Sequence, residues 1–206
     1  MYGIVISFQD FDVFKGIFHS PFVGFANFRT LFDMPDFTNA LKNTLIISLL
    51  KLAVIFPATI LFALLINEIH TGWFRKFIQT TSYLPYFVSW VIAAGIWYKL
   101  LSIDGGVVND FLLSLQLIEE PFYFVASQHA FYPLIVFTEA WKSMGFSAII
   151  FIAALSAIDP QQYEAAKVDG ASRFRQIWHI SLPGIKNTIV LLFILIALCA
   201  KWIAPF

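Results

Sequence analysis

Three long apolar stretches, separated by polar segments, dominate the hydrophobic pattern of this chain. They cover residues 44–66, 78–101 and 132–155, and a fourth runs from 188 to about 203. About 20 helical residues cross the hydrocarbon core of a bilayer, so each of the first three is long enough to span it. Because open strands leave backbone groups unpaired in lipid, the pattern predicts an all-α fold, a polytopic helical membrane protein. Residues 1–8 are too short to span, and we interpret them as the end of an earlier span.

Composition agrees with the hydrophobic pattern. The chain of 206 residues is 59% hydrophobic and only 13% charged, whereas soluble domains carry about 25% charged residues. The formal net charge of zero argues against nucleic acid as a partner. The single cysteine, Cys199, lies in an apolar run and cannot form an intrachain disulfide, so we interpret it as a buried structural thiol.

The charges of the connecting segments predict an orientation in the membrane. Segments 67–77 and 156–187 carry lysine and arginine, whereas 102–130 carries four carboxylates and neither basic residue. The positive-inside rule then places the two basic segments in the cytoplasm and the acidic segment outside, with residues 9–41 also outside. This arrangement alternates across all three complete spans, and we treat residues 1–206 as a single transmembrane domain.

The segment between the third and fourth stretches has the signals of two short helices. Asp159 is a good N-cap residue, and Pro160 suits the first helical position. Gly170 is able to take the left-handed conformation that closes such a helix. Ser172 is placed to cap a second helix over residues 173–180.

The two short helices present different faces. In the second, Phe174, Ile177 and Trp178 follow the spacing of a face that packs against the bundle. The first presents small alanines beside charged residues, which suits a helix that docks into a cleft on another protein. A solvated connector between two spans is the alternative interpretation of the same pattern.

Seven residues in this segment have a fixed spacing: EAA, three residues, G, nine residues, I, one residue, LP. They are Glu164, Ala165, Ala166, Gly170, Ile180, Leu182 and Pro183. This spacing resembles the cytoplasmic EAA loop of ABC importer permeases, the membrane subunits of binding-protein-dependent transport systems. The stretches SPFVGFANFRTLF, leading into ALKNTLIISLLKL, and NEIHTGWFRKFIQTTSYLPYFVSWVIAAGIWY are similar to the carbohydrate group of that family. Within this group, the polysaccharide and lipoprotein-associated permeases of Gram-positive bacteria are the most similar. The resemblance extends to about Leu195.

The resemblance implies a type I importer transmembrane domain, the MetI-like helical bundle, in a bacterial plasma membrane. It implies a second permease subunit, ATPase subunits, an extracellular solute-binding protein and a carbohydrate substrate as partners. The helix 160–169 would enter a groove of the ATPase, with Glu164 and Asp169 as charged contacts, Ala165 and Ala166 packing closely and Gly170 providing the bend. ATP hydrolysis would occur on the partner, because this sequence has no GxxxxGK[ST] phosphate loop. We expect no cofactor, no metal site and no catalytic residue.

The chain departs from the family in its number of spans. Family members usually have six, whereas this sequence has three complete spans and pieces of two others. We therefore expect an incomplete permease domain. A non-transporting membrane scaffold or a nonfunctional permease fragment remains the alternative to carbohydrate import. A secondary transporter is disfavoured because no repeated half or coupling-ion site is visible, and a membrane enzyme because no catalytic cluster converges.

Polar and aromatic residues within the apolar stretches are candidates for the substrate pathway. The third stretch supplies Glu139, Trp141 and Lys142; Glu139 and Lys142 are three residues apart and could pair. Ionisable groups in membrane segments usually face the bundle interior or water, so the pair either lines the pathway or braces the bundle. The second stretch supplies Ser89 and Trp90, for which an interfacial aromatic belt is the alternative. The four histidines are scattered and predict no metal site. Lys51 in the first stretch could pair with a neighbouring helix.

Overall fold

The computed structural model describes residues 2–14, 16–69 and 71–198, and within these ranges the regular elements are helices. An isolated bridge between Gln9 and Phe22 is the exception. The prediction of an all-α chain is confirmed. Cys199, His70 and the end of the fourth apolar stretch lie outside the described residues. The chain forms two compact units, Met1–Ile46 and Ile47–Phe206.

The N-terminal unit is held together by a cluster of aromatic rings. It contains α1 (Tyr2–Ile6), α2 (Gly16–His19), α3 (Ala26–Asp33) and most of α4 (Pro35–Leu50). The ring of Phe8 lies 6.2 Å from Phe22, 5.4 Å from Phe25 and 5.2 Å from Phe28. The Asn27 side-chain amide donates to the carbonyls of Ser7 and Gln9 and so connects α3 to the turn that follows α1.

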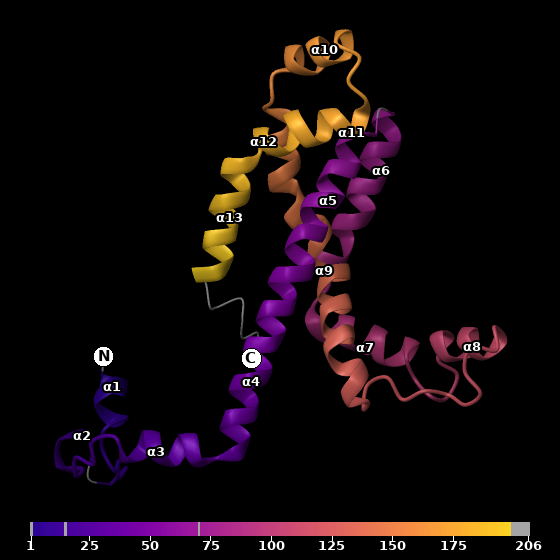
Figure 1. Cartoon of the computed structure of the whole chain (residues 1–206). Coiled ribbons are helices and arrows are strands. Elements are labelled where there is room, and N and C mark those ends of the chain that lie inside the picture. Colours follow the sequence, from indigo (N-terminus) through magenta and orange to yellow (C-terminus); the bar gives the residue numbers. More distant parts are fainter. Residues whose placement is uncertain (1, 15, 70, 199–206) are drawn as a thin grey trace. The chain divides into compact units, whose positions relative to one another are not determined.

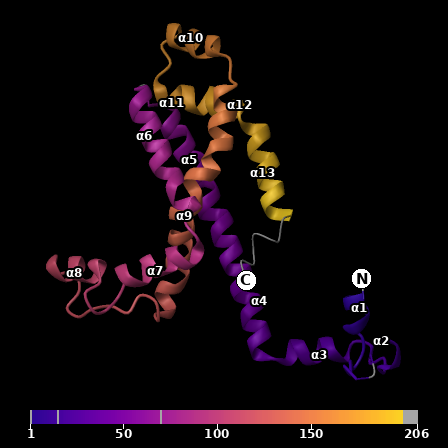
Figure 2. The same cartoon turned by 180° about the vertical axis from the view of Figure 1, so that it is seen from behind.

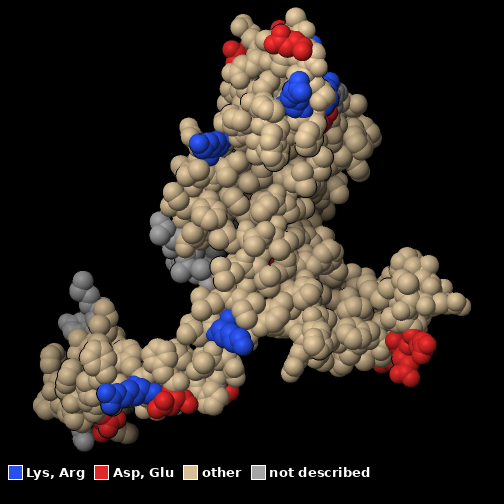
Figure 3. All heavy atoms as spheres, in the orientation of Figure 1, with Lys and Arg blue, Asp and Glu red and all other residues tan. Residues whose placement is uncertain are grey.

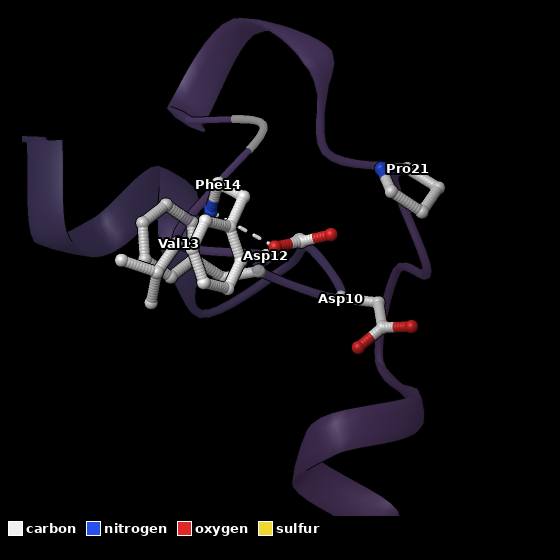
Figure 4. Close-up of a pocket in the computed structure, with 6 residues that line it drawn as sticks. Asp10, Asp12, Val13, Phe14 and Pro21 are labelled. Carbon is white, nitrogen blue, oxygen red and sulfur yellow. Dashed lines mark hydrogen bonds between the residues drawn. The ribbon is translucent and has the colours of Figure 1, made fainter.

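A shallow hollow opens beside the turn that follows α1 (Figure 4). Asp10, Asp12, Val13, Phe14 and Pro21 line it, together with Phe11. The amide of Phe14 donates to the Asp12 carboxylate at 2.9 Å, which closes a local turn.

The first apolar stretch lies within one long helix. It comprises α4, the π-helical turn η1 (Lys51–Ile55) and α5 (Phe56–Asn67), and it is continuous over Pro35–Asn67. Pro57 is the second residue after the π turn. Proline has no N–H to donate inside a helix, and a π turn is one way for the backbone to pass it.

The second apolar stretch, predicted as one membrane span over 78–101, is divided. It forms α6 (Gly72–Tyr83), the 3₁₀ turn η2 (Leu84–Phe87) and α7 (Trp90–Leu100). Val88 and Ser89 are extended, and the Ser89 hydroxyl accepts from the amide of Ile92 to begin α7. Pro85 lies at the start of η2, where its ring and its missing N–H disfavour continuation of the α-helix.

The third stretch is α9 (Gln128–Ser156), which packs along α5 and α6 (Figures 1 and 2). Among the described residues, Pro35–Asn67 and Gln128–Ser156 are long and apolar enough to cross a membrane as single helices. A third crossing is added if Arg173–Gly184 and Lys186–Ala197, bent by 59°, form one span.

The core of the C-terminal unit lies between α5 and α9. Its buried side chains are Ala63, Leu64, Ile66, Ala148, Phe151, Ile152, Leu155 and Ile185. Gly145 allows α9 to approach α6 closely, because a Cβ at this position would collide with the Ser82 carbonyl.

Asn109 organises the connection between α7 and α9, which contains α8 (Val107–Ser114). The Asn109 side chain is fully buried. It donates to the carbonyls of Ser102 (2.8 Å) and Phe122 (3.1 Å) and accepts from the amide of Phe122 (2.9 Å). The Asn109 side chain thus supplies the hydrogen-bond partners that regular secondary structure would otherwise give to these backbone groups.

Candidate functional site

The first short helix of the EAA loop is α10 (Pro160–Val168), closed at both ends as the sequence predicted. The Asp159 carboxylate accepts from the amide of Gln161 at 2.9 Å. At the other end Gly170 has a φ of +75°. The amide of Ala171 donates to the carbonyl of Ala166, and that of Gly170 to Lys167, the pattern of a Schellman cap.

The α10 helix projects from one end of the C-terminal unit, beyond α11 (Figure 1). Glu164, Ala165 and Asp169 are exposed, and Ala166 is half-buried. The Tyr163 hydroxyl lies 3.0 Å from that of Ser181 and tethers the helix to the segment beneath it. Figure 3 shows charged side chains gathered at this end of the unit, and a largely uncharged surface along its length.

The second half of the loop departs from the predicted helix over 173–180. It forms α11 (Arg173–Gln176), the π-helical turn η3 (Ile177–Ser181), α12 (Leu182–Gly184) and then α13 (Lys186–Leu198). The Ser172 hydroxyl caps α11 by accepting from the amide of Arg175, as expected. Leu182 packs against the core, whereas Ile180 is half-buried and Pro183 is exposed.

Of the predicted packing face Phe174, Ile177 and Trp178, Ile177 packs against the core, whereas the prediction is wrong for Phe174 and Trp178. These side chains are 74% and 60% exposed, and their rings stack on each other at 6.1 Å. Gln176 and Ser181 are buried instead. In a π turn the hydrogen bonds run from i to i+5 instead of i to i+4, which changes the rotation per residue, so the regular α-helical spacing does not predict the buried face.

The seven residues of the EAA motif therefore fall into two groups. Glu164, Ala165, Ala166 and Gly170 form the projecting helix and its cap, whereas Ile180, Leu182 and Pro183 belong to the segment that leads back to the bundle. Arg173 reaches Glu68 at the end of α5, with 3.7 Å between the charged atoms. This contact joins the two basic connections that the sequence placed on the same side.

The proposed pairing of Glu139 with Lys142 does not form, although both lie on α9. The Glu139 carboxylate lies 3.2 Å from the ammonium of Lys51 in η1. Lys142 instead donates to the carbonyls of Pro85 (3.4 Å), Tyr86 (2.8 Å) and Val88 (2.6 Å). The two side chains leave α9 toward different neighbouring helices, a choice that sequence spacing does not contain.

The aromatic pathway candidates also separate into two places. The Trp141 ring packs edge-on to Trp97 at 5.4 Å, and Trp97 also contacts Phe137 at 5.3 Å. The Lys142 ammonium lies 5.2 Å from the centre of the Trp90 ring. Ser89, Trp90 and Lys142 are thus brought together at the break between α6 and α7, whereas Trp141 and Glu139 face other parts of the unit.

The described residues contain no group of three or more histidine, cysteine or acidic side chains that could hold a metal ion.

The hydrogen bond between the hydroxyls of Tyr163 and Ser181 was not predicted from the sequence. It joins two residues that are distant in sequence, and only the motif spacing around them hinted that the segments act together.

Comparison with known proteins places this geometry in a family. A family model described as "Binding-protein-dependent transport system inner membrane component" matches residues 36–200. The "Polygalacturonan/rhamnogalacturonan transport system permease protein YteP" of Bacillus subtilis is 48% identical over 95% of this chain and 60% of its own length. "Protein LplB" of the same organism is 43% identical over 95% of this chain and 61% of its own length. The chain thus spans about 60% of the length of these relatives.

A solved structure has the same fold. It is titled as a bacterial ABC transporter involved in the import of the acidic polysaccharide alginate, and it superposes with a TM-score of 0.82 at 42% identity, over 88% of this chain and 63% of the other. A second structure of the alginate transporter, in complex with an alginate pentasaccharide-bound periplasmic protein, gives 0.80 at 43% identity, over 84% and 59%. From the family match, the shared fold and the EAA motif on its projecting helix, the chain belongs to the family of binding-protein-dependent transport system inner membrane components.

Proposed function

We propose that this chain forms part of the membrane-spanning permease subunit of an ATP-driven importer for carbohydrates. The observation that carries the proposal is α10, a capped and exposed helix that bears Glu164, Ala165 and Ala166 at the end of a helical bundle. A helix held out from its own core, with small side chains beside charged ones, suits close packing against another protein.

The partner at α10 is an ATPase subunit on the cytoplasmic side. The basic residues of segments 67–77 and 156–187 support this side by the positive-inside rule. ATP binding and hydrolysis belong to that partner, and the permease receives the motion. Glu164 and Asp169 supply charged contacts, while Ala165 and Ala166 allow the two surfaces to approach.

The substrate is an oligosaccharide derived from a polysaccharide, delivered by an extracellular solute-binding protein to a pair of permease subunits. The printed functions of the relatives support this class: one transports polygalacturonan or rhamnogalacturonan, and the alginate transporter was solved with a pentasaccharide-bound periplasmic protein. Glu139 and Lys142 are both engaged within the bundle. Aromatic side chains such as Trp141 are therefore better candidates for contact with sugar rings.

The test is reconstitution of the permease with its partner permease, ATPase and binding protein in proteoliposomes. Uptake of a labelled oligosaccharide and substrate-stimulated ATP hydrolysis are measured for Glu164→Lys and for Gln162→Ala, an exposed position on the same helix outside the motif. We expect Glu164→Lys to abolish uptake and release the ATPase, and Gln162→Ala to behave as the parent does. Equal uptake by the parent and Glu164→Lys would reject the docking role of α10. Absence of uptake by the parent with every oligosaccharide tried would favour a non-transporting scaffold.

A further inference from the structure

Lys142 has an unusual environment for a charged residue in an apolar helix. It is 7% exposed, and within the described part of the chain its ammonium has no carboxylate at salt-bridge distance. Its three ammonium protons are matched by three carbonyl acceptors, those of Pro85, Tyr86 and Val88. The rings of Tyr86 and Trp90 lie 5.6 and 5.2 Å from the same nitrogen. A buried cation is thus satisfied by backbone dipoles and aromatic faces.

These acceptors belong to the break in the second apolar stretch. Where η2 ends and Val88 becomes extended, the carbonyl of Pro85 accepts from the amide of Val88, whereas those of Tyr86 and Val88 have no following helical N–H groups to accept from. An apolar surrounding offers no water in their place. The Lys142 ammonium supplies the missing donors, so the break and the lysine depend on each other.

Two further contacts hold the same face of α9 against the break. Gly145, three residues after Lys142, lets α9 approach the Ser82 carbonyl at the end of α6. Phe146, four residues after Lys142, stacks on the ring of Tyr86 at 3.9 Å. Lys142, Gly145 and Phe146 therefore form one continuous contact, which we call the α9 clamp.

The α9 clamp has a direct mechanical connection to α10. From Lys142, α9 continues without a break to Ser156, about 21 Å of helix at 1.5 Å per residue. Asp159 then caps α10. The α9 clamp is where α9 meets the least regular part of the second stretch.

We propose that Lys142 is a positioning residue that holds the break at Leu84–Ser89 in register with α9, and that it transmits motion of α10 to this break. The first part concerns the chain alone. The second part rests on the proposed function, because it requires an ATPase that moves α10. The carbonyl cage leaves no proton on the ammonium for a substrate, so Lys142 acts on transport without touching the cargo.

The experiment is hydrogen–deuterium exchange of the full-length permease in lipid nanodiscs, first without partners. Peptides that cover residues 82–93 report the break, and peptides within 128–138 serve as an internal reference. We expect Lys142→Met to speed exchange at 82–93 by about tenfold, because the carbonyls of Tyr86 and Val88 lose their donor. Lys142→Arg keeps the charge and several donors, and an intermediate rate is expected. The control is Lys99→Met, an exposed lysine in the last turn of α7, which should leave the rate unchanged.

A second arm adds the ATPase and traps it with nucleotide and vanadate. In the parent, trapping should change exchange at 82–93; in Lys142→Met this response should be lost, and in Lys99→Met kept. Parental exchange in Lys142→Met, or equal acceleration by Lys99→Met, would overturn the positioning role. If Lys142→Met is not recovered from membranes, the same comparison is made with Lys142→Arg, and a parental rate there overturns the dependence on ammonium geometry. A normal first arm without any nucleotide response in the parent would instead reject the proposed function and leave the clamp standing.

Discussion

The ammonium of Lys51 lies 3.2 Å from a carboxylate oxygen of Glu139, an ion pair that joins the π turn of the first long helix to the middle of α9. Both side chains are mostly shielded, 17% and 16% exposed. Each charge alone would be costly in an apolar setting, so the pair neutralises both helices at the point where they touch. Lys51, rather than Lys142, is therefore the partner of Glu139 in the ion pair that braces the bundle.

Removal of one member of this pair should destabilise the bundle. We expect Glu139→Gln or Lys51→Met alone to cost about 1–3 kcal/mol, because the remaining charge is left without its partner in a poorly solvated place. The double variant should recover part of the loss. Thermal unfolding of the purified permease in detergent, arranged as a double-mutant cycle, measures the coupling. Strict additivity of the two single effects would contradict the pairing.

Charge exchange separates the true partner of Glu139 from its neighbour in sequence. Lys51→Glu combined with Glu139→Lys keeps an ion pair and should retain most of the stability and expression in membranes. Glu139→Lys combined with Lys142→Glu should fail, because a carboxylate would face the carbonyls of Tyr86 and Val88 and two lysines would meet. Membrane yield and unfolding temperature are compared for the two exchanges. Equal behaviour would contradict the arrangement described here.

At Gly170 in the EAA loop, an added side chain would meet no steric obstacle but would strain the backbone. Its φ is +75°, and an added Cβ would find nothing within 4 Å. Gly170→Val should therefore cost at least about 1 kcal/mol through left-handed strain alone, and Gly170→Asn less. We expect α10 to lose its cap and transport-coupled ATP hydrolysis to fall in the same order. Hydrolysis that is identical in Val and Asn variants would show that the left-handed turn is unimportant.

The hydroxyl contact between Tyr163 and Ser181 should set how firmly α10 is held. Tyr163→Phe removes a single hydrogen bond worth about 1 kcal/mol and leaves the ring in place. We expect faster amide exchange in 160–168 with unchanged insertion into membranes. Ser181→Ala should give the same phenotype, and the double variant should be no worse than either alone. Additive effects would mean that the two hydroxyls act separately.

Asn109 should control the order of the segment between α7 and α9. Asn109→Ala leaves the amide and carbonyl of Phe122 and the carbonyl of Ser102 without their partner, at a cost of about 1–3 kcal/mol per buried group. We expect limited proteolysis of the purified permease in detergent to cut within 103–125 faster than in the parent. Asp110→Asn, an exposed neighbour on α8, is the matched control. Equal cleavage of the two variants would contradict the role of Asn109.

Local signals in the sequence were sufficient wherever a structure depends on residues close to one another. The caps at Asp159 and Ser172 and the left-handed turn at Gly170 are satisfied by backbone groups only a few residues away. The helical nature of the apolar stretches follows from their length and from the backbone's need for internal hydrogen bonds in lipid. Pro85 was visible as well, but the complete division of the second stretch is a property of the tertiary structure that the proline alone did not predict.

Contacts between helices could not be predicted from local sequence signals, because they depend on how each helix is rotated about its axis. The π turn at Ile177–Ser181 changes that rotation, so Phe174 and Trp178 are exposed while Gln176 and Ser181 are buried. Likewise, Glu139 and Lys142 share a helix, yet one meets Lys51 and the other meets the carbonyls at the break.

By itself, the sequence determined that this protein is a helical membrane chain with an EAA loop. Span length, helix capping and motif spacing each depend on residues that are close together in the sequence. Only the tertiary structure decided that Glu139 pairs with Lys51 and not with Lys142. It also decided that the seven motif residues divide between a projecting helix and the segment that anchors it. The physical reason is that a side chain's partner is fixed by the packing of whole helices, and the free energy of that packing is summed over residues far apart in the chain.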